Sequence, residues 1–73
     1  MTSTGIVKDK VKLVVHEKPS FTSDSVYIIC SGERVVIDHE ESTDCMYKVY
    51  TEIGIEGFCD KNFIEIEKGG SNG

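Results

Sequence analysis

The fold follows first from residues 45–59, CMYKVYTEIGIEGFC. Apolar and polar side chains alternate from Cys45 to Thr51, which is typical of a half-buried strand. Ile53-Gly54 then allows a tight turn, and Ile55 to Cys59 resumes as a second apolar segment. This stretch predicts a β-hairpin in which Tyr47 and Val49 face inward.

The segment before this hairpin has a similar pattern. Val26 to Cys30 is a short apolar run, Ser31-Gly32-Glu33 favours a tight turn, and Arg34 to His39 continues as a strand. Val35 and Ile37 share one face of that strand and are expected to point inward together. A further hairpin is predicted here.

The N-terminal part predicts one opening strand from Ile6 to Val15, because β-branched residues are frequent in it. Lys8, Lys10 and Lys12 alternate and would lie on one face of that strand. His16 to Ser25 follows as a polar loop rich in turn-forming residues.

Two apolar features lie outside the predicted strands described so far. Phe21 is an aromatic residue inside a polar loop, and we expect it to cover one end of the fold rather than to stand exposed for binding. Asp60 to Phe63 suits a single helical turn, and Ile64 with Ile66 predicts a last short strand.

A chain of 73 residues is long enough for one compact domain only. We expect an all-β fold, a small barrel of five to six short antiparallel strands with one short 3-10 turn, because closure removes exposed strand edges. The predicted organisation is an N-terminal extension over 1–5, a barrel domain over 6–67 and a flexible tail over 68–73.

The formal net charge of −5 and the scattered basic residues argue against nucleic acid and anionic membrane as partners. No apolar run approaches the roughly 20 residues of a membrane span, and the N-terminus lacks a signal-peptide core. The chain as written is therefore not expected to follow the usual secretory route.

Cysteine and acidic residues give no signature of a metal or cofactor. Cys30, Cys45 and Cys59 are an odd set without a C-x-x-C pair, so reduced, buried thiols are expected. A catalytic pair of one cysteine with His16 or His39 remains open on spacing alone, although no nucleophile signature surrounds any cysteine. The acidic residues from Asp38 to Asp44 lack a calcium-loop pattern and are interpreted as a solvated surface.

Four motifs resemble the bacterial SH3 (SH3b) family in their order along the chain. They are Leu13-Val14-Val15-His16 running into Lys18-Pro19-Ser20, then Met46-Tyr47-Lys48-Val49, Gly57-Phe58-Cys59 and Asn62-Phe63-Ile64. The resemblance covers about residues 11–66. It departs from the family at three positions, where Met46 stands for tryptophan, His16 for arginine and Lys18 for glycine, so that any ligand groove is altered.

The resemblance implies a non-catalytic module that recognises cell-wall peptide, peptidoglycan or another protein. Aromatic platforms and a few polar groups would hold such a ligand. The candidate ligand-binding residues are Tyr27, Tyr50, Phe58, Asp44, Glu56 and Met46. Tyrosines on small barrels also pack half-buried, and Phe58 suits the core better than a groove.

A second function class is a structural or assembly protein of a larger particle, such as a phage tail or capsid component, docking through strand edges or loops. The expected location is the cell wall if the chain belongs to a larger secreted protein, and otherwise the cytoplasm or a virion. Neither class requires an enzyme, a cofactor or a metal.

Overall fold

The computed structural model describes residues 2–67, which form seven antiparallel strands and one 3-10 turn. The all-β class and the single short 3-10 turn are therefore confirmed. The elements are β1 (Thr2–Val7), β2 (Lys12–His16), β3 (Ser25–Cys30), β4 (Arg34–Asp38), β5 (Met46–Thr51), β6 (Glu56–Asp60), η1 (Lys61–Phe63) and β7 (Ile64–Ile66).

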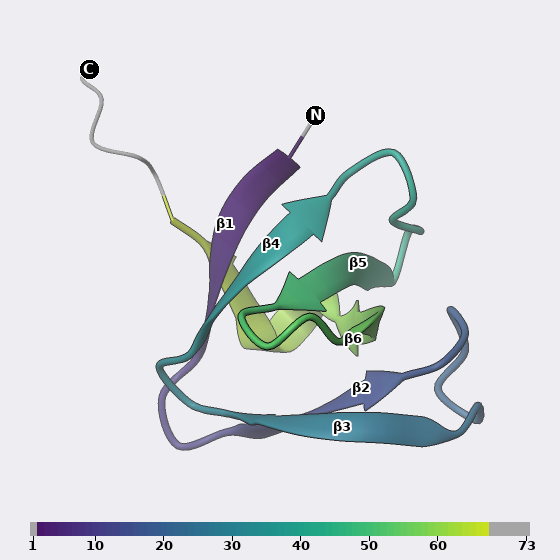
Figure 1. The fold of residues 1–73 in the computed structure, drawn as a ribbon, viewed down its shortest axis with the longest axis horizontal. Helices are drawn as coiled ribbons and strands as arrows, with labels where there is room; N and C mark the ends of the chain where they lie inside the picture. Colours follow the sequence, from purple (N-terminus) through teal and green to yellow (C-terminus); the bar gives the residue numbers. More distant parts are fainter. Residues whose placement is uncertain (1, 68–73) are drawn as a thin grey trace.

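The strands form one sheet in the order β3-β2-β6-β5-β4-β1-β7. The sheet bends over itself, so that the β2–β3 hairpin forms a layer beneath β4 and β5 (Figure 1). The barrel expected from the sequence differs in two ways. There are seven strands rather than five or six, and the sheet stays open between its edge strands β3 and β7 within the described chain.

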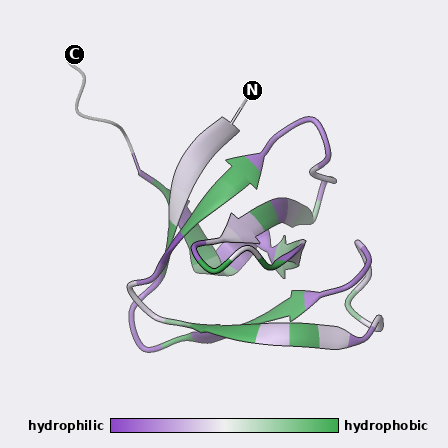
Figure 2. Ribbon diagram, viewed as in Figure 1, coloured by the Kyte–Doolittle hydropathy of each residue, from purple (hydrophilic) through white to green (hydrophobic). Residues whose placement is uncertain are grey.

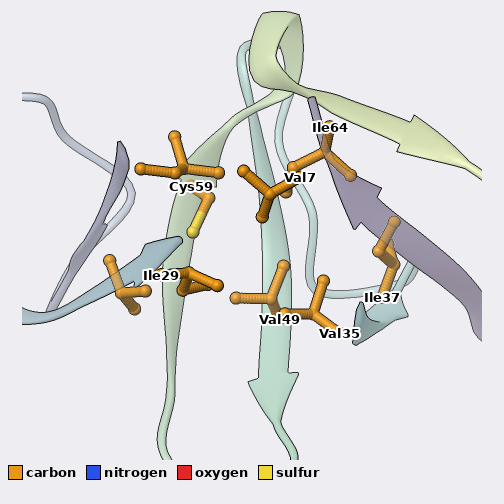
Figure 3. Close-up of a cluster of buried hydrophobic side chains, with 9 residues drawn as sticks. Val7, Ile29, Val35, Ile37, Val49, Cys59 and Ile64 are labelled. Atoms are coloured by element: carbon orange, nitrogen blue, oxygen red, sulfur yellow. The ribbon is translucent and has the colours of Figure 1, made fainter. Parts of the chain in front are cut away.

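The core lies between these two layers. Val35 and Ile37 point into it from β4, as predicted, and meet Val49 of β5 and Ile29 of β3 (Figure 3). Tyr47 packs against the same cluster, which confirms that it shares the inner face with Val49. The other core members are Val7, Leu13, Val15, Cys59 and Ile64.

Hydrophobic residues are concentrated in the strands, while the connection between β4 and β5 is strongly hydrophilic (Figure 2). That connection contains the acidic residues predicted to form a solvated surface, and Glu40, Glu41 and Asp44 are exposed. Residues 2–67 include no helix that is long and apolar enough to cross a membrane.

The hairpin predicted from residues 45–59 is confirmed as β5 and β6, which pair from Met46↔Asp60 to Tyr50↔Glu56. Gly54 closes the turn with a φ of 89°, a conformation that residues with a side chain rarely adopt. The Gly54 N–H donates to the carbonyl of Thr51 at 3.0 Å, which fixes the turn.

The predicted opening strand is wrong, because the chain turns between β1 and β2. Lys10 has a φ of 61° there, and pairing resumes only at Lys12. Lys8 and Lys10 therefore do not share a strand face with Lys12. Thr2–Val7 pairs with both β4 and β7, so most of the extension predicted over 1–5 belongs to the sheet. The tail predicted over 68–73 lies outside the described residues.

The hairpin predicted at Ser31-Gly32-Glu33 is also wrong in its pairing. The turn exists, with Gly32 at a φ of 84°, but β3 pairs with β2 whereas β4 pairs with β1 and β5. Val7 of β1 forms two backbone hydrogen bonds with this turn. Its carbonyl accepts from the Gly32 N–H at 2.9 Å, and its N–H donates to the Glu33 carbonyl at 3.0 Å. The turn therefore carries the chain from one layer to the other.

Gly57 marks the place where the two layers join. β2 and β6 pair only at His16↔Phe58, and a Cβ on Gly57 would lie 2.5 Å from Val15 Cγ1 and 2.6 Å from the His16 carbonyl oxygen. The backbones of β2 and β6 therefore approach closely at this glycine.

Candidate functional site

Three of the six candidate residues meet on the outer face of the sheet. Tyr50 pairs with Glu56, and Phe58 pairs with Lys48, across β5 and β6. The Lys48 ammonium lies 3.2 Å from Glu56 Oε1, 5.0 Å from the centre of the Phe58 ring and 5.6 Å from that of Tyr50.

This Lys48 cluster leaves little surface for a ligand. The Lys48 side chain is only 15% exposed and covers the Phe58 ring, which is itself buried. A cation held over two aromatic faces and beside a carboxylate is already satisfied. The cluster therefore covers the outer face of β5 and β6. The expectation that Phe58 is buried is confirmed.

The other three candidate residues lie apart from the cluster and from one another. Met46 is fully buried, so it cannot contact a ligand. Tyr27 of β3 packs against the core and borders a small hollow beside Arg34 and Ile53. Asp44 lies near Phe21, on the connection between β4 and β5. The six residues therefore do not form one site.

A groove lies instead between the 17–24 loop and η1. It encloses about 230 Å³, and its lining includes Val14, His16, Phe21 and Phe63. Phe21 is 52% exposed and Phe63 is 40% exposed, so two aromatic rings face solvent at one place. Because Phe21 is exposed, the expectation that it covers an end of the fold rather than standing exposed is wrong; its ring forms a T-shaped contact with that of His16, with 6.1 Å between ring centres.

The 17–24 loop is held by its own hydrogen bonds. His16 Nδ1 donates to the Ser23 carbonyl at 3.1 Å, since a carbonyl can only accept. Ser23 Oγ lies 3.0 Å from the Lys18 carbonyl and 2.7 Å from that of Ser20, and the Glu17 N–H donates to Asp24 at 2.9 Å. The loop therefore presents Phe21 from a fixed support.

The opposite wall is fixed by η1. The Asp60 carboxylate accepts from the Asn62 N–H at 2.9 Å and caps the turn. The Phe63 carbonyl accepts from the Lys8 N–H at 3.0 Å, and the Lys61 N–H donates to the Cys45 carbonyl at 3.1 Å. The 3-10 turn η1 is thus tied to Lys8 on one side and to Cys45 on the other.

A polar hollow continues the groove past Phe21. Phe21 and Asp60 line both spaces, and Asp44, Cys45, Lys61 and Asn62 complete the polar one. The Lys61 ammonium lies 5.1 Å from the centre of the Tyr47 ring. The combined site therefore offers an apolar end and a polar end to one elongated ligand.

The three cysteines differ in their surroundings. All three are free, and the expectation of buried thiols holds only for Cys59, since Cys30 and Cys45 are exposed at the ends of strands. Burial, with a smaller effect of the Asp60 carboxylate, raises the pKa of the Cys59 thiol to about 12. No group of three or more His, Cys, Asp or Glu side chains within residues 2–67 is placed to hold a metal ion.

Comparisons with protein-family models, with curated proteins and with solved structures find no match for this chain.

Sequence reasoning noticed Phe21 as an unusual aromatic residue but missed its partners. Phe63 was interpreted as part of a helical turn and of a closing motif, and His16 as a departure from a family pattern and a possible catalytic partner of a cysteine. No local signal joins Phe21 to Phe63, because the groove brings β2 and the adjoining 17–24 loop next to η1, which is distant in the sequence.

Proposed function

We propose that this chain is a non-catalytic binding module of the bacterial SH3 type that holds an extended peptide in the groove between Phe21 and Phe63. The observation that carries the proposal is the pair of exposed aromatic rings on two independently fixed supports. Rigid aromatic walls with a few polar groups are typical of peptide-binding grooves, because they bind at little cost in conformational entropy.

The two ends of the groove suggest how such a peptide is oriented. An apolar side chain fits between Phe21 and Phe63, while the polar part of the peptide lies near Asp44 and Asp60. The two carboxylates outnumber the Lys61 ammonium at that end, which favours an amino group over a phosphate or a carboxylate. Cell-wall peptide is the first source to test, because the motif resemblance implies it.

A non-catalytic role agrees with the chemistry of the cysteines. A thiol with a pKa of about 12 is almost wholly protonated near neutral pH, so Cys59 is a poor nucleophile. The groove itself is open; Cys45 borders its polar end, and its apolar end contains no cysteine.

The test is co-sedimentation of the reduced protein with intact Gram-positive peptidoglycan. We expect saturable pelleting by the wild type and loss of pelleting by Phe21→Ser and Phe63→Ser. Ile53→Ser is the matched control, because Ile53 is a large exposed hydrophobic residue on the β5–β6 turn, outside the groove. Tyr50→Ala tests the outer-face cluster in the same way.

Two results would contradict the proposal in different ways. Pelleting that survives both phenylalanine substitutions but is lost in Tyr50→Ala would move the site to the Lys48 cluster. Absence of pelleting by the wild type would exclude the cell wall as the source of the peptide.

A further inference from the structure

His16 is the last residue of β2 and lines the groove at the point where the 17–24 loop begins (Figure 1). Two contacts hold its half-buried imidazole ring. Nδ1 donates to the Ser23 carbonyl, and the ring forms a T-shaped contact with that of Phe21. The orientation of the ring, and with it the position of its second nitrogen, is therefore fixed.

The hydrogen bond to Ser23 decides which nitrogen of the neutral ring carries the proton. A neutral imidazole has one N–H donor and one acceptor nitrogen. Because a carbonyl can only accept, the proton lies on Nδ1, and Nε2 keeps its lone pair. Within residues 2–67 no group forms a hydrogen bond with Nε2, and no buried side-chain nitrogen or oxygen lacks a partner. Nε2 of His16 is therefore an acceptor in contact with solvent.

The second histidine of the chain is arranged differently. His39 Nε2 lies 2.8 Å from Ser3 Oγ, and its ring contacts Tyr47. His39 is also not among the residues that line the groove. Of the two histidines in the sequence, His16 is thus the one that offers a free acceptor beside the exposed aromatic rings.

We propose that His16 is a specificity-determining residue of the groove, where Nε2 of its neutral ring accepts a hydrogen bond from an N–H group of the bound peptide. This inference rests on the proposed function and deepens it, because it names the group that must accompany the apolar side chain between Phe21 and Phe63. A bound segment without an N–H at this place would leave Nε2 desolvated and unpaired, so the groove selects against it.

The same nitrogen makes peptide binding depend on pH. Protonation of His16 adds a proton at Nε2 and converts the acceptor into a donor. Two N–H groups then face each other, and the hydrogen bond to the peptide is lost. Histidine side chains ordinarily change charge between pH 5 and 8. Binding should therefore be strong at neutral pH and weak in mild acid.

The charged side chains around His16 come from every element packed against it. They are Lys12 on its own strand, Asp60 on β6, Glu17 and Asp24 at the two ends of the loop, and Lys48 of β5 beyond the Phe58 ring. Three carboxylates and two ammonium groups thus surround the ring, so a positive charge on His16 is tolerated in the folded protein.

The first experiment needs no ligand. Two-bond proton–nitrogen NMR correlation spectra of the isotope-labelled, reduced protein show which ring nitrogen carries the proton. At about pH 7.5 we expect the Nδ1–H tautomer for His16, with Nε2 unprotonated. An Nε2–H tautomer would overturn the inference, even if the protein binds peptidoglycan.

The second experiment compares co-sedimentation with intact Gram-positive peptidoglycan at about pH 7.5 and about pH 5.5. We expect the wild type to bind about tenfold or more weakly at the lower pH. His16→Asn should bind weakly at both values, because its amide reaches only as far as Nδ1 and leaves no acceptor at the position of Nε2. His16→Gln, whose amide reaches that position, should bind more tightly than His16→Asn and equally at both values.

His39→Gln is the matched control and should keep the pH dependence of the wild type, because His39 does not line the groove. A pH dependence that arises from the cell wall itself would appear in every variant. Circular dichroism checks that the variants are folded.

Three outcomes would overturn the inference. Equal affinity of the wild type at both pH values is the first, and a His16→Gln variant with the pH dependence of the wild type is the second. If Phe21→Ser and Phe63→Ser still lose binding in these two cases, the groove stands and only the role of His16 fails. Absence of pelleting by the wild type at both pH values is the third, and it contradicts the proposed function together with this role of His16.

Discussion

The core and the Phe21–Phe63 groove both consist largely of apolar side chains, which are enclosed in the core and exposed in the groove. Ile37 and Val49 are fully enclosed between two layers of the sheet, and substitution there affects the whole fold. Phe21 and Phe63 present a large part of their rings to solvent. Burying an aliphatic side chain stabilises the fold by about 1.5–3 kcal/mol, so the half-exposed rings contribute only part of what they could. The proposed function assigns this uncovered apolar surface to peptide binding rather than to stability.

The largest effect is expected in the core. Ile37→Ala should lower the free energy of unfolding by about 3 kcal/mol, because it removes buried methyl groups and leaves a cavity. A chain of this size has only about 3–5 kcal/mol of stability, so the variant should be largely unfolded. Urea unfolding followed by circular dichroism measures the free energy of unfolding of the variant and of the wild type.

Val36→Ala is the control, because Val36 is the next residue on the same strand and faces solvent. Its free energy of unfolding should change by less than about 0.5 kcal/mol. Equal losses in the two variants would contradict the assignment of inner and outer faces on β4.

A smaller loss is expected where the two layers join. In Gly57→Ala the new methyl group would meet Val15 and the His16 carbonyl, and backbone atoms cannot move aside as a flexible side chain can. We expect a loss of about 2 kcal/mol in urea unfolding. Gly54→Ala meets no atom within 4 Å but keeps a φ of 89°, so it should cost about 1 kcal/mol. The reverse order would show that turn strain, rather than the contact at Gly57, limits stability.

The buried thiol should make stability depend on alkaline pH. In the unfolded chain Cys59 ionises above its ordinary pKa of 9.0, whereas in the folded chain it keeps its proton until about 12. The unfolded state therefore binds fewer protons, and the free energy of unfolding falls as pH rises between these values. Between pH 8 and pH 10 the fall due to this thiol is about 1.4 kcal/mol.

Cys59→Ala should lack this part of the pH dependence, which urea unfolding at both pH values measures. Iodoacetamide offers an independent measurement: Cys30 and Cys45 should be alkylated in the folded protein, and Cys59 only after unfolding. Alkylation of all three cysteines at one rate would mean that Cys59 is not enclosed.

The sequence predicted the later strands well because their signals are local. The bounds of β5, β6 and η1 differ from the predicted ones by a residue, since alternation and Gly54 act over a few positions. The pairing of β1 with β4 and β7 could not be predicted in this way. This pairing depends on contacts between segments that are distant in the sequence. The turn at Lys10 also contains no glycine from which it could be predicted.

The candidate site was harder to predict for the same reason. Tyr50, Glu56 and Phe58 were found together because they lie on one hairpin. Met46 was misinterpreted as a ligand-binding residue, since a pattern that alternates cannot show that the outer face is covered at that end. Gly5, too, gave no signal, although a Cβ there would meet Ile64 at 2.6 Å.

A small effect on stability is expected in the groove, and its size shows whether Phe21 and Phe63 belong to the core. Phe21→Ser and Phe63→Ser should each change the free energy of unfolding by about 1 kcal/mol or less, because water already reaches much of each ring. The same substitutions should abolish peptide binding, so affinity and stability would separate. A loss near that of Ile37→Ala would mean that the two rings belong to the core, and the case for a binding groove would then fail even if binding were lost.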